Sequence, residues 1–169
     1  MGVITRVAGS GTPGNSRDDG PATVAQLHEP AGVAVTADGG LLFADYFNSV
    51  VRAVSAEGVI SRVAGNGTAG NSGDDGPATD AQLNTPFGVA VTADGGFLFT
   101  DTGNNEVRKV SAAGMISRVA GNGTVGNSGD DGAATGAQLN QPVGVAVTAD
   151  GGFLFADGRN NEVREVLAD

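Results

Sequence analysis

The chain of 169 residues contains no cysteine and no tryptophan, and its one histidine is His28. Without cysteine, neither a disulfide framework nor a thiolate metal site can form. A catalytic zinc site needs roughly three protein ligands, usually histidines, which His28 alone cannot supply. We therefore expect no catalytic residues. The apolar runs are short, so we also expect a soluble chain with no transmembrane segment and no signal peptide in these residues.

Basic residues are scarce as well. Nine lysines and arginines face nineteen acidic residues, which gives a formal net charge of −10. This balance disfavours contact with a phosphate backbone and predicts no nucleic-acid partner and no membrane partner. It favours a basic protein or a small cationic ligand. The compartment stays open.

Glycine, in contrast, is abundant, with 29 residues interleaved with valine-rich runs. The motifs Gly2-Val3-Ile4, Gly58-Val59-Ile60 and Gly114-Met115-Ile116 open three units of 56 residues each. The units cover residues 2–57, 58–113 and 114–169 of one domain, 1–169. A fixed period of this length indicates a repeat architecture.

The middle unit predicts four short strands, at residues 88–92, 97–100, 106–110 and 115–119, separated by turn clusters. The first two strands are apolar on both faces. The last two carry Arg62, Arg108 and Lys109 in the repeat, which suits an outer rim. This order predicts an all-β propeller of four-stranded antiparallel blades, three per chain. A parallel β-helix is the alternative, although its coils are usually shorter.

The runs that carry a family resemblance are Pro86-Phe87-Gly88-Val89-Ala90-Val91, Phe97-Leu98-Phe99-Thr100-Asp101 and Asn104-Asn105-Glu106-Val107-Arg108. Together they resemble the NHL repeat, and Gly73-Asp74-Asp75-Gly76 resembles the long connection of a bacterial subset of such proteins. The resemblance implies a propeller that is typically six-bladed and a non-enzymatic binding scaffold. A propeller lyase or hydrolase that depends on a divalent ion is the alternative.

Three blades do not close a ring, because propellers usually have about four to eight. We expect residues 3–7 to form a lone outer strand, whereas the third unit ends after its third strand at residues 162–166. A head-to-tail homodimer would let this lone strand complete the last blade of the other copy, giving a six-bladed ring with Velcro closure. A fragment of a longer propeller and a ring of another blade number are the alternatives.

Acidic pairs recur in the long loops, at Asp18, Asp19, Asp74, Asp75, Asp130 and Asp131. Calcium needs roughly six to eight converging oxygen ligands, and these loops lack the spacing of an EF-hand. We therefore expect these residues to form turns and to bind no cofactor. Weak calcium binding is the alternative.

A second set of polar residues follows the second strand of each unit. The loops Tyr46-Phe47, Thr102-Gly103 and Gly158-Arg159 are the most divergent part of the repeat. In a propeller these loops emerge on the same face as the long loops. The candidate ligand-face residues are Asp45, Tyr46, Phe47, Asp101, Thr102, Asp157 and Arg159. Drift in a solvent-exposed loop is the simpler explanation of the divergence, and ligand tuning is the alternative.

Overall fold

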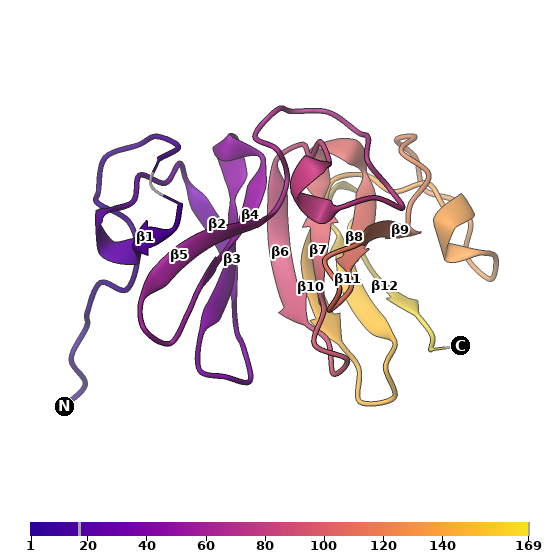
Figure 1. The fold of residues 1–169 in the computed structure, drawn as a ribbon. Coiled ribbons are helices and arrows are strands. Elements are labelled where there is room, and N and C mark those ends of the chain that lie inside the picture. Colours follow the sequence, from indigo (N-terminus) through magenta and orange to yellow (C-terminus); the bar gives the residue numbers. More distant parts are fainter. Residues whose placement is uncertain (17, 169) are drawn as a thin grey trace.

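The computed structural model describes residues 1–16 and 18–168. Over these residues the chain is all-β, with twelve strands in three antiparallel sheets and no α-helix. The sheets stand side by side in a row, as Figure 1 shows, and short 3₁₀ turns lie at one end of them. None of the described helices has the length and apolar character that crossing a membrane requires.

Each sheet is built from strands that follow one another along the chain. The first has the order β1-β5-β4-β3-β2, with bounds Gly20–Pro21, Val59–Ala64, Val50–Val54, Leu41–Asp45 and Pro30–Val35. The second has the order β6-β7-β8-β9, with bounds Pro86–Val91, Phe97–Asp101, Glu106–Val110 and Ile116–Ala120. The third has the order β10-β11-β12, with bounds Pro142–Val147, Phe153–Asp157 and Glu162–Val166. The strands expected in the middle unit therefore form within two residues of their predicted bounds.

The strands are joined by tight turns whose residues are specified by the local sequence. Between β6 and β7, Asp94 Oδ1 accepts hydrogen bonds from Thr92 Oγ1 at 2.5 Å and from the Gly96 N–H at 3.2 Å. Gly95 has a φ of +82°, which glycine adopts without a steric penalty. Turns of the same sequence fold the first and third sheets, because the residues that form them repeat.

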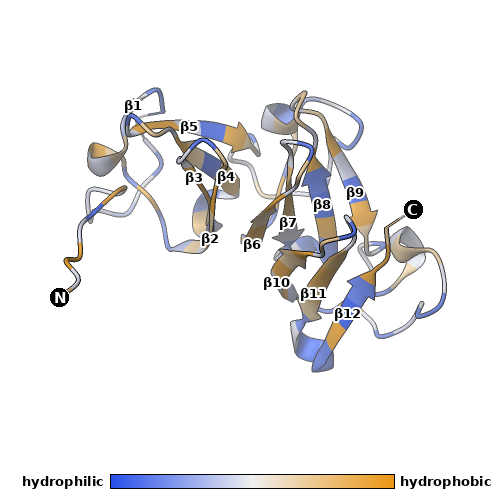
Figure 2. Ribbon diagram, turned by 90° about the horizontal axis from the view of Figure 1, so that it is seen from below, coloured by the Kyte–Doolittle hydropathy of each residue, from blue (hydrophilic) through white to orange (hydrophobic). Residues whose placement is uncertain are grey.

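The second sheet packs against both of its neighbours through apolar side chains on the two sides of β7. Phe97, Leu98 and Phe99 are only 7%, 3% and 0% exposed. Phe97 and Phe99 belong to the apolar cluster shared with the first sheet, whereas Leu98 belongs to the cluster shared with the third. Figure 2 shows these apolar strands inside and hydrophilic residues on the loops. The expected two-sided burial is confirmed for β7, whereas β6 is partly exposed, with Phe87 at 40%.

In the first and second sheets, glycine lets the first long strand approach the corresponding strand of the next sheet closely. A Cβ on Gly32 would lie 2.2 Å from the Phe87 carbonyl oxygen, and one on Gly88 would lie 2.3 Å from that of Val143. The register of β6 against β7 shifts between Pro86 and Val89, around Gly88. A side chain at either glycine would therefore push two neighbouring sheets apart.

The N-terminal segment does not form the strand that the sequence predicts. Residues 1–8 belong to no strand in the described chain, and Val3 and Ile4 are 88% and 98% exposed. Figure 1 shows this segment leading away from the first sheet. An isolated β-strand is unstable without a neighbour to satisfy its backbone groups, which explains its absence here.

Candidate functional site

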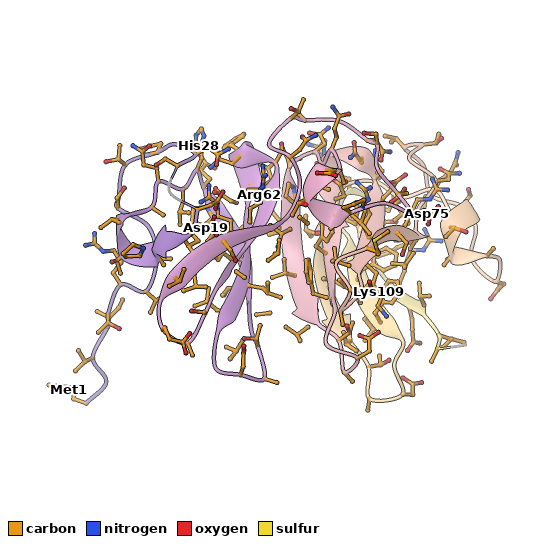
Figure 3. All side chains as sticks on the ribbon, in the orientation of Figure 1. Met1, Asp19, His28, Arg62, Asp75 and Lys109 are labelled. Atoms are coloured by element: carbon orange, nitrogen blue, oxygen red, sulfur yellow. The ribbon has the colours of Figure 1, made fainter. Side chains whose placement is uncertain are left out.

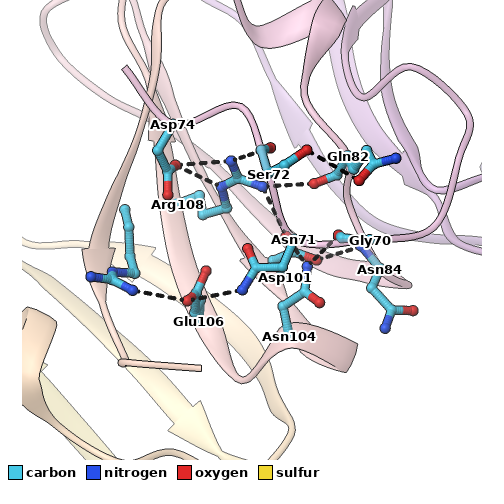
Figure 4. A network of polar contacts seen from close by, with 11 residues as sticks. Gly70, Asn71, Ser72, Asp74, Gln82, Asn84, Asp101, Asn104, Glu106 and Arg108 are labelled. Atoms are coloured by element: carbon cyan, nitrogen blue, oxygen red, sulfur yellow. Dashed lines mark hydrogen bonds and ion pairs between the residues drawn. The ribbon is translucent and has the colours of Figure 1, made fainter. Parts of the chain in front are cut away.

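A buried arginine on β8 joins two of the candidate aspartates. Arg108 Nη2 lies 2.8 Å from Asp74 Oδ1, and Arg108 Nη1 lies 3.2 Å from Asp101 Oδ2. The same guanidinium donates to the carbonyl oxygens of Gln82 at 2.9 Å and Ser72 at 3.2 Å. The Arg108 side chain is 0% exposed, although the sequence placed it on the outer rim. Figure 4 shows it at the centre of a polar network.

Asp101 ties the end of β7 to the long loop that precedes β6. Its Oδ1 accepts the Asn84 backbone N–H at 2.7 Å, and its Oδ2 accepts the Asn104 side chain at 2.9 Å. Asn104 also donates to the Gly70 carbonyl oxygen at 2.8 Å. The long loop and the short turn after β7 are therefore fastened together at one end of the sheet, which we call the loop end.

The first sheet has a similar arrangement, but the guanidinium is oriented differently. Arg52 Nη1 lies 3.2 Å from Asp18 Oδ1, and Arg52 Nε lies 2.9 Å from Asp45 Oδ2. The Nε–H is not aligned well enough with this oxygen to count as a hydrogen bond, so the pair is held by charge. Arg52 Nη2 donates to Asn15 Oδ1 at 2.5 Å instead.

The third sheet repeats the network closer to solvent. Arg164 Nη2 lies 2.8 Å from Asp130 Oδ1, and Arg164 Nη1 lies 3.4 Å from Asp157 Oδ2. The Asp130 side chain is 72% exposed, compared with 33% for Asp74 in the second sheet. The network therefore recurs three times around an arginine, which is fully buried in the first two sheets and 9% exposed at its side chain in the third.

Burial governs the proton affinity of the inner aspartates. Desolvation raises the pKa of Asp101 to about 6, against the opposing effects of the Asn84 N–H, the Asn104 side chain and Arg108. Desolvation raises the pKa of Asp45 as well, against the opposing hydrogen bonds from Asn48 and His28. Burial within the folded network causes both pKa shifts. The shifts therefore do not by themselves mark a reactive site.

Four of the candidate ligand-face residues have almost no surface with which to contact a ligand. These residues are Asp45, Asp101 and Asp157, each 0% exposed, and Thr102, which is 6% exposed. Thr102 Oγ1 donates to the Pro142 carbonyl oxygen at 2.6 Å, across to the third sheet. These four side chains are therefore part of the buried framework at the loop end.

The metal candidates fall into two groups of three. Asp18, Asp74 and Asp130 contact the arginines described above. Asp19, Asp75 and Asp131 are exposed and take left-handed φ values of 64°, 62° and 61°. Among the described residues, no three acidic or histidine side chains are grouped closely enough to hold a metal ion. A turn role fits the second group, because aspartate tolerates positive φ better than most residues.

The loop end does carry one exposed aromatic cluster, formed by His28, Tyr46, Phe47 and Phe87. The ring centroids of Tyr46 lie 4.8 Å from Phe47 and 6.0 Å from Phe87, and those of His28 and Phe47 lie 5.0 Å apart. Phe47 and Phe87 are 51% and 40% exposed. The cluster lies at the boundary between the first and second sheets; Figure 3 labels His28 at the loop end.

The boundary between the second and third sheets lacks this cluster. The residues at the corresponding sequence positions are Asn84, Thr102, Gly103 and Val143. In the third unit, exposed Arg159 donates from Nε to Gln141 Oε1 at 2.6 Å. The divergent loops found in the sequence therefore produce three different local surfaces on one repeated framework.

Comparison with known sequences finds relatives that match this chain over part of their length. No protein-family profile matches the chain. Protein SUPPRESSOR OF QUENCHING 1, chloroplastic, of Arabidopsis thaliana is 31% identical over 173 residues, which is 96% of this chain and 16% of the plant protein. Human teneurin-4 is 37% identical over 97 residues, which is 50% of this chain and 4% of teneurin-4. The chain thus spans a small part of the curated relatives it matches.

Comparison with solved structures shows the fold. A protein of unknown function from Bacteroides thetaiotaomicron shares 26% identity at a TM-score of 0.64, over 76% of this chain and 32% of that one. An auxiliary nutrient binding protein from the same organism shares 17% identity at a TM-score of 0.61, over 79% and 36%. A gluconolactonase from Xanthomonas campestris shares 19% identity at a TM-score of 0.54, over 77% and 35%. The chain has a β-propeller-like fold.

Sequence reasoning missed the role of the arginines. Arg52, Arg108 and Arg164 recur at the repeat spacing, two residues after the start of the third strand in each sheet. Each stands 34 residues after an aspartate of the long loop and seven after an aspartate that ends the second strand. Because the whole unit repeats, every pair of repeated residues keeps its spacing, so this pattern by itself did not mark the contact.

Proposed function

We propose that the chain is a non-enzymatic binding module of the NHL type. The observation that carries the proposal is the exposed aromatic cluster at the loop end, on a framework whose inner carboxylates are held by arginines. Exposed aromatic side chains grouped on one surface mark a binding site more often than a chance feature. The loop end supplies a different surface at each sheet boundary, which suits recognition better than a catalytic role repeated in each sheet.

The chemistry of the cluster favours a cationic ligand, either a basic peptide segment or a small organic cation. Aromatic ring faces attract cations, and the effect grows where the site is partly desolvated. Exposed Asp19, Asp75 and Asp131 lie in the long loops, and the chain carries a net charge of −10. The summed field would draw cations toward this surface and repel polyanions.

The two functional alternatives are both found on this fold. A nutrient binding protein and a gluconolactonase are among the similar structures. Similarity at these identities concerns the fold, and one fold carries many functions. Our preference for binding therefore rests on the aromatic cluster and on the engagement of the candidate carboxylates, not on the comparisons.

Tyr46 provides a direct probe, because it is the only tyrosine and the chain has no tryptophan. We expect a saturable change in tyrosine fluorescence when a lysine- and arginine-rich peptide or tetramethylammonium is added. Phe47→Ala and Phe87→Ala should each weaken binding about tenfold, in line with ~1–2 kcal/mol for a partly desolvated cation–π contact. Val125→Ala is the matched control, since Val125 is an exposed apolar residue of the third long loop.

Two results would overturn the proposal. The first is the absence of any saturable change with either cation. The second is equal weakening by Val125→Ala, which would show that general charge attraction, not the cluster, accounts for the signal. A DNA oligonucleotide serves as the polyanionic comparison and should leave the fluorescence unchanged.

A further inference from the structure

The third sheet has an open edge where the other two sheets are complete. In the second sheet, β9 pairs with β8 and closes the sheet on its outer side. In the first sheet, β5 pairs with β4 in the same way. The third sheet ends at β12 within the described chain. The unpaired backbone groups of β12 form a ready site for one more strand.

A hollow lies where the missing strand would stand. It has a volume of about 800 Å³ and is lined by residues 129–134 and 162–167, with Ala137 and Phe155 among the apolar side chains at its wall. Ala134, Ala137 and Phe155 are the repeat counterparts of Ala22, Ala25 and Phe43, which share the apolar cluster of Ile60 in the first sheet. Ile60 is 0% exposed, and its counterpart Ile116 in the second sheet is 1% exposed. The hollow therefore corresponds to the space that Ile60 fills in the first sheet and Ile116 fills in the second.

The chain itself carries a segment that fits this site. Residues 3–8 differ from residues 59–64, which form β5, only at Thr5. Ile4 takes the position of Ile60 in this alignment and is 98% exposed. Figure 1 places the N-terminal segment beside the first sheet, at the opposite end of the row from β12. The segment therefore has the sequence of a strand that pairs beside β4. In its own first sheet, β5 already occupies that position.

The charges agree with the same placement. In the second sheet, Arg118 Nη1 lies 3.2 Å from Glu106 Oε1, which also accepts Asn71 Nδ2 at 3.2 Å. In the third sheet, Asn127 Nδ2 donates to Glu162 Oε1 at 3.1 Å. Arg6 is the repeat counterpart of Arg118. A segment docked along β12 would thus bring Arg6 to Glu162.

The two ends of the row are complementary in their apolar faces as well. On the first sheet, Val33 is 69% exposed, whereas its counterpart Val89 in the second sheet is 7% exposed. On the third sheet, Val163 is 73% exposed, whereas its counterpart Val107 is 0% exposed. The exposed face at each end of the row therefore corresponds to a face that the second sheet buries against a neighbouring sheet.

Gly144 gives the same conclusion from the backbone. Its counterparts Gly32 and Gly88 each leave no room for a Cβ, because the next sheet lies against them. A Cβ on Gly144 would meet nothing within 4 Å. The third sheet is therefore shaped for a neighbour that stands where the second sheet stands relative to the first.

We infer that the partner of these surfaces is a second copy of this chain. Residues 3–8 of each copy add a strand to β12 of the other, and the first sheet of each copy packs against the third sheet of the other. The contact is heterologous, and two copies joined twice in this way form a closed ring of six sheets. The ring leaves no unpaired edge at β12 and no exposed apolar face at either end.

Native mass spectrometry and analytical ultracentrifugation of the 169-residue chain test the inference. We expect a single species of twice the chain mass. Ile4→Asp and Gly144→Ala should each convert it to a monomer with an unchanged circular dichroism spectrum, since both positions lack neighbours in the single chain. Each change acts at two contacts, so the dissociation constant should rise about 100-fold or more. Gly136→Ala is the control, because that glycine is also exposed with no neighbour within 4 Å.

A charge exchange identifies the register of the docked strand. Arg6→Glu and Glu162→Arg should each weaken the dimer, and the double variant should recover part of the loss. A monomeric parent chain, a ladder of open oligomers, or a dimer unaffected by Ile4→Asp and Gly144→Ala would overturn the inference. So would a double variant weaker than both single variants, because Arg6 and Glu162 would then not be neighbours.

Discussion

Arg108 Nη1 lies 3.2 Å from Asp101 Oδ2, and both side chains are 0% exposed. Removing two charges from water is costly, and the attraction between them offsets this cost only when the remaining hydrogen bonds are satisfied. Here Arg108 also reaches Asp74 and two carbonyl oxygens, and Asp101 accepts a backbone N–H and an amide. The pair therefore fastens three segments of the chain at one point.

Breaking this pair should cost far more than breaking a surface pair on the same strand. We expect Arg108→Met to lower the free energy of unfolding by about 3–5 kcal/mol, because it leaves a buried carboxylate without its partner. Lys109→Met is the matched control, as Lys109 Nζ pairs with exposed Asp94 Oδ2 at 2.7 Å. Its cost should stay below about 1 kcal/mol. Urea denaturation of both variants makes the comparison, and equal costs would contradict it.

The raised pKa of Asp101 should appear in the pH dependence of stability. The folded chain holds this proton more tightly than the unfolded chain, since burial raises the pKa from 3.8 to about 6. The contribution of Asp101 is therefore fully present below the unfolded pKa and is lost as the pH rises through about 6. Over this window we expect a loss of about 2–3 kcal/mol.

Asp101→Asn removes the titrating group and should remove this slope. The measurement is the difference in unfolding free energy between parent and variant at several pH values from about 4 to 7. Asp75→Asn, at an exposed position, is the control and should keep the slope of the parent. A difference that does not change with pH, or that changes in the opposite direction, would show that Arg108 outweighs desolvation.

The backbone at Thr85 is strained, and relieving the strain should stabilise the protein. Thr85 has a φ of 50°, which is unfavourable for a β-branched residue. We expect Thr85→Asn to raise the free energy of unfolding by about 1 kcal/mol, because asparagine tolerates this conformation. Thr124→Asn is the control, since Thr124 is exposed and is not among the residues with positive φ. No gain at Thr85, or an equal gain at Thr124, would contradict the argument.

Gly88 should be intolerant of any side chain. A Cβ there would lie 2.3 Å from the Val143 carbonyl oxygen, so the second and third sheets would have to separate. We expect Gly88→Ala to cost about 2–3 kcal/mol, at the upper end for overpacking. Gly136→Ala, where the Cβ meets nothing within 4 Å, should be nearly neutral. Thermal melts of the two variants would contradict the prediction if their midpoints coincide.

The long loops should not respond to calcium. Asp18, Asp74 and Asp130 are paired with arginines, and calcium would have to displace these guanidinium groups. A bound ion would stabilise the folded state and raise Tm. Since we expect no calcium to bind, about 5 mM calcium chloride should shift Tm by less than ~1 °C relative to magnesium chloride. A larger rise with calcium that is lost in an Asp74→Asn variant would favour the metal alternative instead.

Much of the fold was predictable because the deciding signals are local. Turn residues such as Asp94 and Gly95 act within a few positions, and the short apolar runs between turns mark the first two strands of each unit. The strand at residues 106–110 was predicted with its observed bounds, Glu106–Val110. The N-terminal strand was not observed, because a strand needs a neighbour that this segment lacks in the single chain.

The sequence by itself determined the repeat, the positions of the strands and turns, and the acidic balance, since each follows from residue order over short distances. Only the tertiary structure decided which polar residues are buried. Asp74 and Arg108 stand 34 residues apart, and nothing in either neighbourhood shows that they touch. Tertiary packing likewise exposed Val163 while burying Val107, although both occupy the same position of the repeat. Burial depends on which sheet stands alongside, and that is a property of the folded row, not of the unit.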